Sequence, residues 1–280
     1  MDRPRSNDEA PSVEELLSPL PEAEGEAAFR RRVRLVQRYY RREMEWRDNI
    51  TPYGVFVSEV MLQQTQVARV STRYPEFLTR FPSFEALADA QLSAVIRAWS
   101  GLGYNRRARY LHEAAKVVVE RFEGVLPREC EKLRSLPGIG ENTAGSIAAF
   151  AYNRPVLFLE TNIRTVYIYY FYPGSERVED KQLLELLDRT MDREEPREWY
   201  YALMDLGVLI KGRVGNPSRR SRSYARQSRF EGSLRQVRGA ILRRLSEGEG
   251  LVHRDVLTSE LGFEEERVAR ALADLWGEGM

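Results

Sequence analysis

Cysteine and histidine are scarce in this 280-residue sequence, which has one cysteine, Cys130, and two histidines. One cysteine cannot form an intrachain disulfide, and it cannot supply the thiolates of an all-cysteine zinc site or an iron–sulfur cluster. Long apolar runs are missing too, which argues against a transmembrane helix. The first residues, MDRPRSNDEAPSVEE, lack the apolar segment of a secretory signal. We therefore expect a cytoplasmic protein with no metal, no cofactor and no membrane partner.

An excess of charge of one sign is also missing. Lysine and arginine number 43 and the acids 42, so the net charge of +1 says nothing about a polyanionic partner. The distribution is uneven: residues 1–26 hold eight acids and four prolines, whereas residues 211–229 hold seven basic residues and no acid. The first pattern predicts a disordered acidic leader over residues 1–27. The second predicts a basic loop that either contacts phosphates or is a solvated linker.

Helical periodicity is what the sequence has in abundance. Apolar residues recur at helical spacing through most of the chain, and no convincing pair of strands is present, so the predicted class is all-α. Residues 162–173 (NIRTVYIYYFYP) are β-rich by propensity, but we expect a helix of core aromatics because no nearby segment offers a partner strand. Residues 230–280 predict a helical extension resembling part of a winged helix, which either packs against the rest or reads sequence.

A Pro-Gly-x-Gly break separates two helical segments at residues 136–140 (LPGIG). Pro137 stops the preceding helix, and Gly138 and Gly140 permit positive φ and close approach of another backbone. The next helix is expected to start near Glu141–Thr143, and its free N–H groups and dipole suit a phosphate. This pattern is typical of a helix–hairpin–helix that grips the DNA backbone. A plain tight turn between two helices is the alternative interpretation.

Four motifs provide the context for that hairpin. They are SEVMLQQTQV at 58–67, GLGY at 101–104, LPGIG at 136–140 and ETNIRTV at 160–166. Together they resemble the helix–hairpin–helix DNA glycosylase superfamily, and SEVMLQQTQV is similar to its MutY branch, which removes adenine opposite 8-oxoguanine. The segment MDLG at 204–207 also fits that branch. The resemblance covers roughly residues 30–210, about two-thirds of the chain.

The resemblance implies a two-lobed helical fold. One lobe would span residues 51–151, with six helices and the hairpin, and the other would join residues 28–50 to residues 152–210. In the family, DNA lies in the cleft between the lobes and the target base is flipped into it. We therefore expect a monomer that binds double-stranded DNA in the bacterial nucleoid.

Hydrolysis of an N-glycosidic bond requires a proton for the leaving base and a carboxylate near the positive charge on the sugar. Glu59 lies in an apolar segment, FVSEVMLQQ, where burial would raise its pKa and keep it protonated. In MutY the matching glutamate is implicated in protonating adenine N7. Glu160 precedes a helix whose dipole favours an ionised carboxylate. Taken alone, Glu59 is better explained as a buried acid paired with an arginine, and Glu160 as a helix cap; the matched motifs favour the catalytic interpretation.

Two positions depart from the family pattern. The family has aspartate where this chain has Glu160, and the extra methylene moves the carboxylate by about 1 Å, a shift to which catalysis is sensitive. Activity can therefore persist, change substrate or be lost. Asn142 stands where the bifunctional lyases carry the lysine that forms a Schiff base. The resemblance accordingly implies a monofunctional glycosylase without lyase activity.

The resemblance also assigns residues to the base pocket and to DNA contacts. Gln63 and Asn142 are expected in the base pocket, and Gln64 matches the glutamine that inserts into the base stack. Both glutamines are alternatively polar residues of an ordinary helix. Asn105 stands where MutY often has a tyrosine that wedges the duplex. The other expected DNA contacts are Tyr104, Arg106, Gly138, Gly140, Thr143, Arg219, Arg220 and Arg222.

Two features of the MutY branch are missing from this sequence. In the family, MDLG is followed by four cysteines that bind a [4Fe–4S] cluster, but Lys211 stands at the first of these positions and no cysteine follows. The 48 residues from 233 to 280 are too few for the Nudix-like domain that recognises 8-oxoguanine. We expect excision of adenine from a mismatch with guanine or 8-oxoguanine. A thymine or uracil mismatch glycosylase and a non-catalytic DNA-binding protein are the alternatives.

Overall fold

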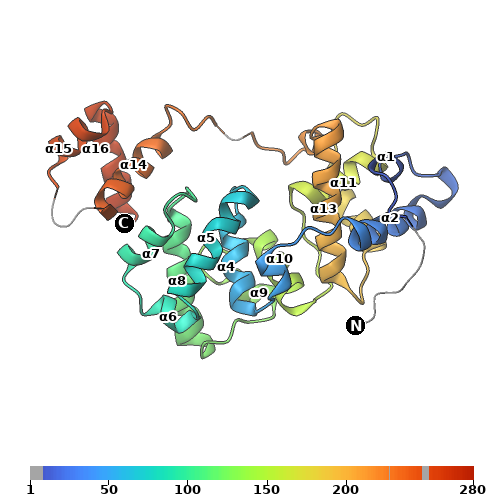
Figure 1. Cartoon of the computed structure of the whole chain (residues 1–280), viewed down its shortest axis with the longest axis horizontal. Helices are drawn as coiled ribbons and strands as arrows, with labels where there is room; N and C mark the ends of the chain where they lie inside the picture. The colour runs from blue at the N-terminus through green and yellow to red at the C-terminus, as the bar shows by residue number, and fades with distance from the viewer. Residues whose placement is uncertain (1–8, 227, 248–251) are drawn as a thin grey trace. The chain divides into compact units, whose positions relative to one another are not determined.

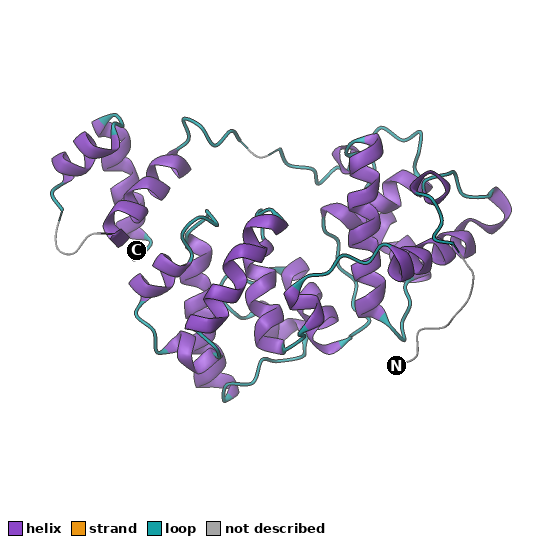
Figure 2. Cartoon of the chain, viewed as in Figure 1, coloured by secondary structure: helices purple, strands orange, loops and turns teal. Residues whose placement is uncertain are grey.

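The computed structural model describes residues 9–226, 228–247 and 252–280, and helices are its regular elements there (Figures 1 and 2). Within these ranges, the β-pairing is limited to an isolated parallel bridge between Val178 and Ser221. The expected all-α class is therefore confirmed. Across the same ranges, every helix is too short or too polar to cross a membrane.

The chain divides into two compact units. Unit 1 comprises residues 1–43 and 148–225, and unit 2 comprises residues 44–147 and 226–280. These boundaries differ from the expected lobes, because the second one falls inside helix α10 (Glu141–Tyr152) instead of after it. The C-terminal extension belongs to unit 2.

Unit 1 is built around aromatic side chains from three helices. Its helices are α1 (Val13–Leu16), η1 (Glu22–Glu24), α2 (Gly25–Tyr39), α11 (Thr161–Phe171), α12 (Asp180–Thr190), α13 (Pro196–Val214) and η2 (Pro217–Arg220). Phe29 of α2 is fully buried, and its ring contacts Tyr167 and Tyr170 of α11 and Trp199 of α13. The tyrosine-rich segment is thus a helix, as expected. Tyr167 and Tyr170 are buried core residues, which leaves them no surface for stacking on a base.

The acidic leader is ordered where the structure describes it, contrary to expectation. Ser12 and Glu15 form a capping box that starts α1, and Leu16 is buried. The Tyr170 hydroxyl donates a hydrogen bond to the Leu16 carbonyl at 2.6 Å, and the Tyr169 hydroxyl donates to the next carbonyl at 2.6 Å. The acidic composition of this segment gives no sign of these two hydrogen bonds to α11. Residues 1–8 lie outside the described residues.

Unit 2 contains the hairpin and the C-terminal extension. Its helices are α3 (Glu45–Asp48), α4 (Pro52–Leu62), α5 (Val67–Arg80), α6 (Phe84–Ala88), α7 (Leu92–Ala98), α8 (Arg106–Phe122), α9 (Cys130–Arg134), the first part of α10, α14 (Leu234–Glu247), α15 (Arg254–Leu261) and α16 (Glu265–Gly277). The fully buried Tyr74, Phe77 and Trp99 belong to its core. Thr51 caps α4 by accepting a hydrogen bond from the Gly54 N–H at 3.0 Å, and Pro52 occupies the first turn.

The C-terminal extension forms the helix, turn and helix that its sequence predicts. Gly262 ends α15 in the left-handed conformation, with φ of 66°. Helices α14 and α16 share a small core of buried residues, namely Val237, Ile241, Leu242, Val268, Ala271 and Leu275, and Leu261 of α15 packs against it. Ile96 of α7 packs against this core, so apolar contacts join the extension to the rest of unit 2.

Candidate active site and nucleic-acid interface

Glu59 lies on α4 among apolar neighbours. Val57, Ser58, Val60 and Met61 are buried, whereas the Glu59 side chain is half-buried. This placement agrees with the apolar helix that the sequence predicts. The raised pKa of Glu59, and with it the role of proton donor, stays a prediction.

The end of α4 is held by Arg107, a residue that the sequence analysis missed. One guanidinium nitrogen of this buried arginine donates hydrogen bonds to the carbonyls of Val60, Met61 and Gln63 at 2.6–2.9 Å. The other donates to the Thr65 hydroxyl at 2.8 Å and to two carbonyls of the GLGY turn. Burial lowers the pKa of Arg107 to about 10. Arg107 therefore ties α4, the GLGY turn and α8 together.

The side chains of the two glutamines after α4 differ in their surroundings: that of Gln63 is hydrogen-bonded within the protein and that of Gln64 is exposed. Gln63 donates a hydrogen bond through Nε2 to the Thr143 hydroxyl at 3.2 Å, which joins α4 to the hairpin helix α10. Gln64 is exposed and has a left-handed backbone with φ of 55°. This strained conformation presents the side chain to solvent, as an inserting residue requires. Asn142 is exposed in the first turn of α10, so Gln63, Thr143 and Asn142 belong to one region of unit 2.

The hairpin is formed by α9, the LPGIG turn and α10, which begins at Glu141 as expected. Gly138 has φ of 76°, and a Cβ there would lie 2.7 Å from Cβ of Tyr110. The backbone thus has a positive φ at Gly138 but not at Gly140, where an added Cβ would meet no heavy atom within 4 Å. Gly140 therefore leaves open space at the turn that leads into α10. This space is where a phosphate would approach the helix.

Tyr104 and Arg106 have partners in the C-terminal extension. The guanidinium groups of Arg107 and Arg235 lie 5.6 and 5.0 Å from the centroid of the Tyr104 ring, and the Tyr104 hydroxyl accepts a hydrogen bond from Arg235. Arg106 is exposed and forms an ion pair with Glu278. Asn105 precedes α8 and is half-buried, without a side-chain cap on that helix. Tyr104 and Asn105 precede α8 and Arg106 begins it, so all three lie next in sequence to Arg107, which holds the end of α4.

Glu160 is anchored at the start of α11 in unit 1. Its carboxylate accepts hydrogen bonds from the backbone N–H of Asn162 at 2.6 Å and of Ile163 at 2.9 Å. The Asn162 amide donates a further bond at 3.2 Å, and the Lys211 ammonium donates to Oδ1 of Asn162 at 2.7 Å. The expected N-cap is therefore confirmed. Lys211, which the sequence analysis noted only in place of a cysteine, belongs to the surroundings of Glu160.

The MDLG motif explains how α13 comes so close to Glu160. Asp205 is buried and accepts hydrogen bonds from the backbone N–H and the side chain of Arg42 at 3.1 and 2.5 Å. At Gly207, a Cβ would lie 2.8 Å from the carbonyl oxygen of Asn162, so only glycine allows this approach. The motif thus supports the position of Asn162 and the carboxylate that Asn162 contacts.

Opposing effects set the pKa of the Glu160 carboxyl. Burial raises it, while the N–H groups of Ile163 and Asn162 and the charges of Lys211 and Arg164 lower it. The net direction is upward from the ordinary glutamate value, because burial is the largest effect. We expected the helix terminus to favour the ionised carboxylate, and its N–H groups do lower the pKa. The larger effect of burial, which raises the pKa, was not expected. A raised pKa makes the carboxylate a better proton acceptor than an ordinary glutamate.

The basic loop contains local structure, and one of its arginines faces inward. Arg220 of η2 donates to the carbonyls of Tyr172, Pro173 and Ser175 at 2.6–3.0 Å, so it caps the chain after α11. Its predicted role in phosphate binding stays a prediction. Arg222 forms an exposed ion pair with Glu179 at 2.7 Å. Arg219 is exposed, and its predicted DNA contact stays a prediction.

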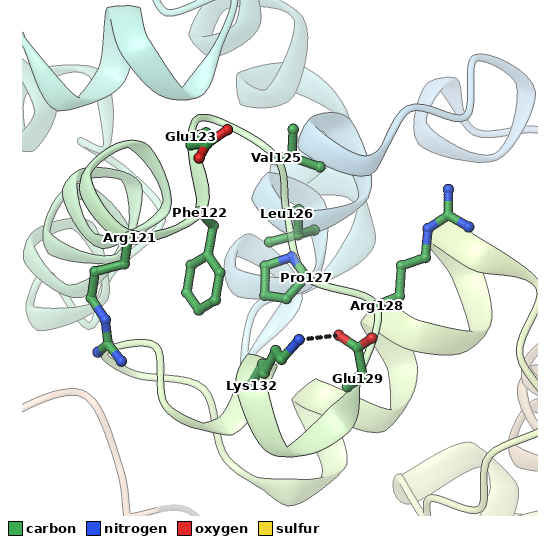
Figure 3. A pocket seen from close by; sticks show the side chains of 9 residues that line it. All are labelled: Arg121, Phe122, Glu123, Val125, Leu126, Pro127, Arg128, Glu129 and Lys132. Atoms are coloured by element: carbon green, nitrogen blue, oxygen red, sulfur yellow. Dashed lines mark ion pairs between the residues drawn. The ribbon is translucent and has the colours of Figure 1, made fainter.

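The structure assigns the two carboxylates to different units, Glu59 to unit 2 and Glu160 to unit 1. Their cooperation stays a prediction. A cavity of about 340 Å³ lies beside the turn that follows α8, where Lys132 pairs with Glu129 at 3.4 Å, and the expected site residues do not line it (Figure 3). Over the described ranges, no three His, Cys, Asp or Glu side chains cluster as metal ligands.

Comparison with known proteins gives the class of this chain. Residues 57–189 match the family described as HhH-GPD superfamily base excision DNA repair protein. The fold is similar to that of a thermostable thymine-DNA glycosylase, with a TM-score of 0.63 at 23% identity, over 70% of this chain and 91% of that one. This likeness concerns the fold alone. The chain belongs to the HhH-GPD superfamily of base excision DNA repair proteins.

Within that superfamily, sequence relatives are adenine DNA glycosylases. The adenine DNA glycosylase of Buchnera aphidicola subsp. Baizongia pistaciae (strain Bp) is 37% identical over 174 residues, which cover 61% of this chain and 49% of that protein. The one from Mycobacterium tuberculosis (strain CDC 1551 / Oshkosh) is 35% identical over 228 residues, which cover 72% of this chain and 73% of that protein. The chain thus spans about half the length of the first relative and more than two-thirds of the second.

Proposed function

We propose that this chain is a monofunctional DNA glycosylase that removes adenine from a mismatch with guanine or 8-oxoguanine in double-stranded DNA. The observation that carries the proposal is the Glu160 carboxylate, anchored by two backbone N–H groups in the ETNIRTV motif. Its support from relatives is the adenine DNA glycosylases at 35–37% identity. The protein acts as a monomer on the chromosome in the cytoplasm.

The reaction assigns different tasks to the two carboxyl groups. Glu59 donates a proton to the leaving adenine while the C1′–N9 bond breaks and its electron pair goes to the base. The positive charge that develops on the sugar is stabilised by the Glu160 carboxylate. A water molecule then adds to C1′ and gives its proton to Glu160, whose raised pKa suits this step. The products are free adenine and an abasic site.

The proposal includes no lyase step and no iron–sulfur cluster. Asn142 has no amine that could form a Schiff base with the abasic sugar, so strand cleavage is not part of the reaction. Cys130 is the one cysteine of the sequence, whereas a [4Fe–4S] cluster needs four cysteine ligands. Lys211, which stands at the position of the family's first cluster cysteine, donates a hydrogen bond from its ammonium group to the Asn162 side chain.

The test is base release from a panel of duplexes that carry A·8-oxoguanine, A·G, T·G, U·G or hypoxanthine. The wild type is expected to release adenine from the first two. Glu59→Gln should lower the single-turnover rate by at least about 100-fold, the contribution of a general acid, without loss of duplex binding. Glu131→Gln is the matched control, because Glu131 is an exposed acid on α9. This control should release base at the wild-type rate.

Other outcomes lead to the alternative functions. Release of pyrimidines alone would make the protein a thymine or uracil mismatch glycosylase. Duplex binding with no base release by the wild type would make it a DNA-binding protein without this activity. Borohydride added to the same reactions should trap no covalent adduct, and a trapped adduct would contradict the role given to Asn142.

A further inference from the structure

Unit 2 contains a groove of about 1040 Å³ beside the expected DNA contacts. Gln64, Tyr104, Asn105 and Gly138 line part of it, and residues of α14 line another part. Its volume is at the upper end of that of drug-sized ligand pockets, so it has room for a segment of a polymer. The extension therefore forms a wall of a groove that begins at the loops expected to contact DNA.

The charge of this groove is of one sign. Among the residues that line it are six arginines and no acid. They are Arg69 of α5, Arg106 and Arg107 of α8, and Arg235, Arg238 and Arg243 of α14. Arg69 and Arg243 are exposed, on different helices. The net charge of the whole chain is close to zero, so this clustering marks a site for a polyanion.

Aromatic and polar side chains complete the groove. Phe230 lines it with 55% of its surface exposed, whereas the Tyr104 ring already contacts two guanidinium groups. An exposed ring within a basic groove is the arrangement with which proteins bind unpaired nucleotides, because phosphates meet the cations and a base stacks on the ring.

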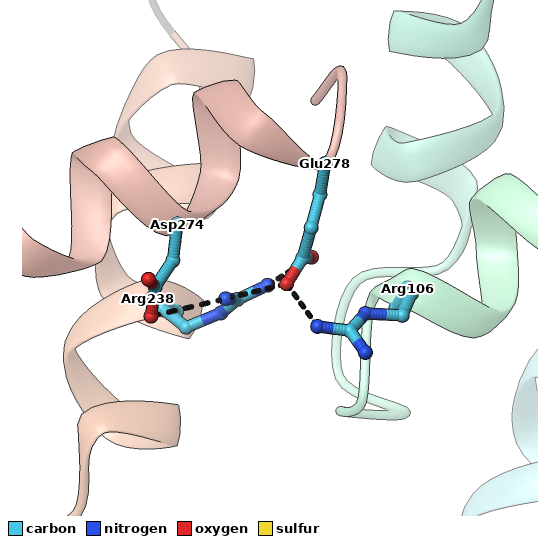
Figure 4. A network of polar contacts seen from close by, with 4 residues as sticks. All are labelled: Arg106, Arg238, Asp274 and Glu278. Atoms are coloured by element: carbon cyan, nitrogen blue, oxygen red, sulfur yellow. Dashed lines mark hydrogen bonds and ion pairs between the residues drawn. The ribbon is translucent and has the colours of Figure 1, made fainter.

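An ion-pair network holds α14 in place beside the groove (Figure 4). Glu278, just after α16, accepts hydrogen bonds from Arg238 of α14 and from Arg106 of α8, one of them 2.9 Å long. Asp274 lies 3.7 Å from Arg238. The charge of Glu278 offsets part of the positive charge of these two arginines. Arg69 and Arg243 keep their exposed positions as phosphate contacts.

The position of the extension favours a binding wall over an inhibitory cover. Gln64, Gly138 and Gly140 remain exposed although α14 is docked nearby. A segment that blocked the DNA-binding loops would bury these residues. The docked extension instead lengthens the surface that they begin.

We infer that α14 and the chain just before it form, with α5 and the GLGY turn, a groove that binds one strand of DNA next to the site of base excision. Arg69 and Arg243 contact its phosphates, and Phe230 stacks on one of its bases. The inference rests on the proposed function for the identity of the polyanion as DNA. It makes residues 228–246 part of the DNA-binding surface.

The first test measures binding to a labelled, fully matched duplex over about 50 to 200 mM salt. Arg243→Ser and Arg69→Ser should each weaken DNA binding. Each should also reduce, by about one, the magnitude of the slope of the logarithm of the binding constant against the logarithm of the salt concentration. Arg270→Ser is the matched control, because Arg270 is exposed on α16 and does not line the groove. An unchanged slope for Arg243→Ser would overturn the inference.

The second test concerns the aromatic ring. Phe230→Ser should weaken binding to a duplex with a short unpaired segment by about tenfold. Trp276→Ser should not, although Trp276 is 86% exposed, because it lies outside the groove. If Phe230→Ser binds this duplex as tightly as the wild type does, the ring does not stack on a base and the inference is overturned. Because these duplexes contain no substrate base, the results are independent of base release, which tests the proposed function.

Discussion

At the scale of single residues, the surroundings of Glu160 show how a structural cap becomes a candidate catalytic group. The two N–H groups fix the direction of the carboxylate, and the Asn162 amide adds a third donor. Lys211 holds that amide from the far side. The carboxylate is therefore held in one geometry while burial raises its pKa. A fixed position reduces the reorganisation that the reaction requires.

Replacement of Lys211 should move the pH dependence of the reaction. The ammonium group lowers the pKa of Glu160, so Lys211→Met removes this effect and raises that pKa further. Under the proposed function, the reaction needs ionised Glu160, and the low-pH limb of the single-turnover rate should shift to higher pH. Arg213→Met, an exposed change on the same helix, should leave the limb in place. An unmoved limb in Lys211→Met would show that Lys211 has no electrostatic role at Glu160.

Sequence reasoning found Glu160 because its neighbours along the chain determine the cap. It missed Arg107 and the carbonyl partners of Arg220, because each arginine binds carbonyls of segments far from it in the sequence. In the sequence, an arginine beside other arginines suggests a phosphate contact. Only the tertiary structure shows which acceptors its guanidinium group binds. The same holds for Lys211, whose partner Asn162 is 49 residues away.

At the scale of elements, the two hairpin glycines have different tasks. Gly138→Ala should destabilise the protein by about 1–2 kcal/mol, because φ is positive and the new Cβ would clash with Tyr110. Gly140→Ala should leave the free energy of unfolding unchanged but weaken duplex binding, because its methyl group enters the space before α10. Urea unfolding and duplex titration measure both effects.

Gly174→Ala is a suitable control for that pair, since an added Cβ meets no heavy atom within 4 Å and φ is not positive. It should change neither stability nor affinity. If Gly140→Ala binds DNA as tightly as the wild type does, the LPGIG segment is a structural turn and not a phosphate grip.

Helices were predictable where periodicity and caps agree, as in α4 with its Thr51 cap and in α15 with its Gly262 stop. The acidic leader and the basic loop were not. In both segments, a few residues have tertiary partners that composition does not reveal. The Leu16 carbonyl accepts a hydrogen bond from Tyr170, and Arg220 donates to the carbonyl of Tyr172 at the end of α11. Composition describes the average polarity of a segment, whereas its tertiary contacts depend on a few individual residues.

At the scale of the whole molecule, the extension is attached to the rest of unit 2 by two kinds of contact. Ile96 packs on its small apolar core, and Glu278 bridges Arg238 and Arg106. The apolar contact is insensitive to pH, whereas the ion pairs require an ionised Glu278. Acid should therefore weaken the attachment of the extension through one identifiable group.

The pKa of Glu278 gives the pH range of that effect. Burial alone would raise it, but hydrogen bonds from Arg238 and Arg106 lower it from 4.5 to about 2. Because the folded pKa is depressed, the stabilisation is fully present above about pH 4.5 and is lost as the pH falls toward 2. At neutral pH, Glu278→Gln should lower the free energy of unfolding by about 1–3 kcal/mol, since two guanidinium groups lose their charged acceptor.

The difference between wild type and Glu278→Gln should then shrink steadily as urea unfolding is repeated below about pH 4.5, since the wild type gradually loses the same charge. Glu266→Gln, a change of an exposed acid on α16, should lie close to the wild type at neutral pH. A difference that stays constant across the acid range would mean that Glu278 acts through its shape and not through its charge. The attachment of the extension would then depend on the apolar contact with Ile96.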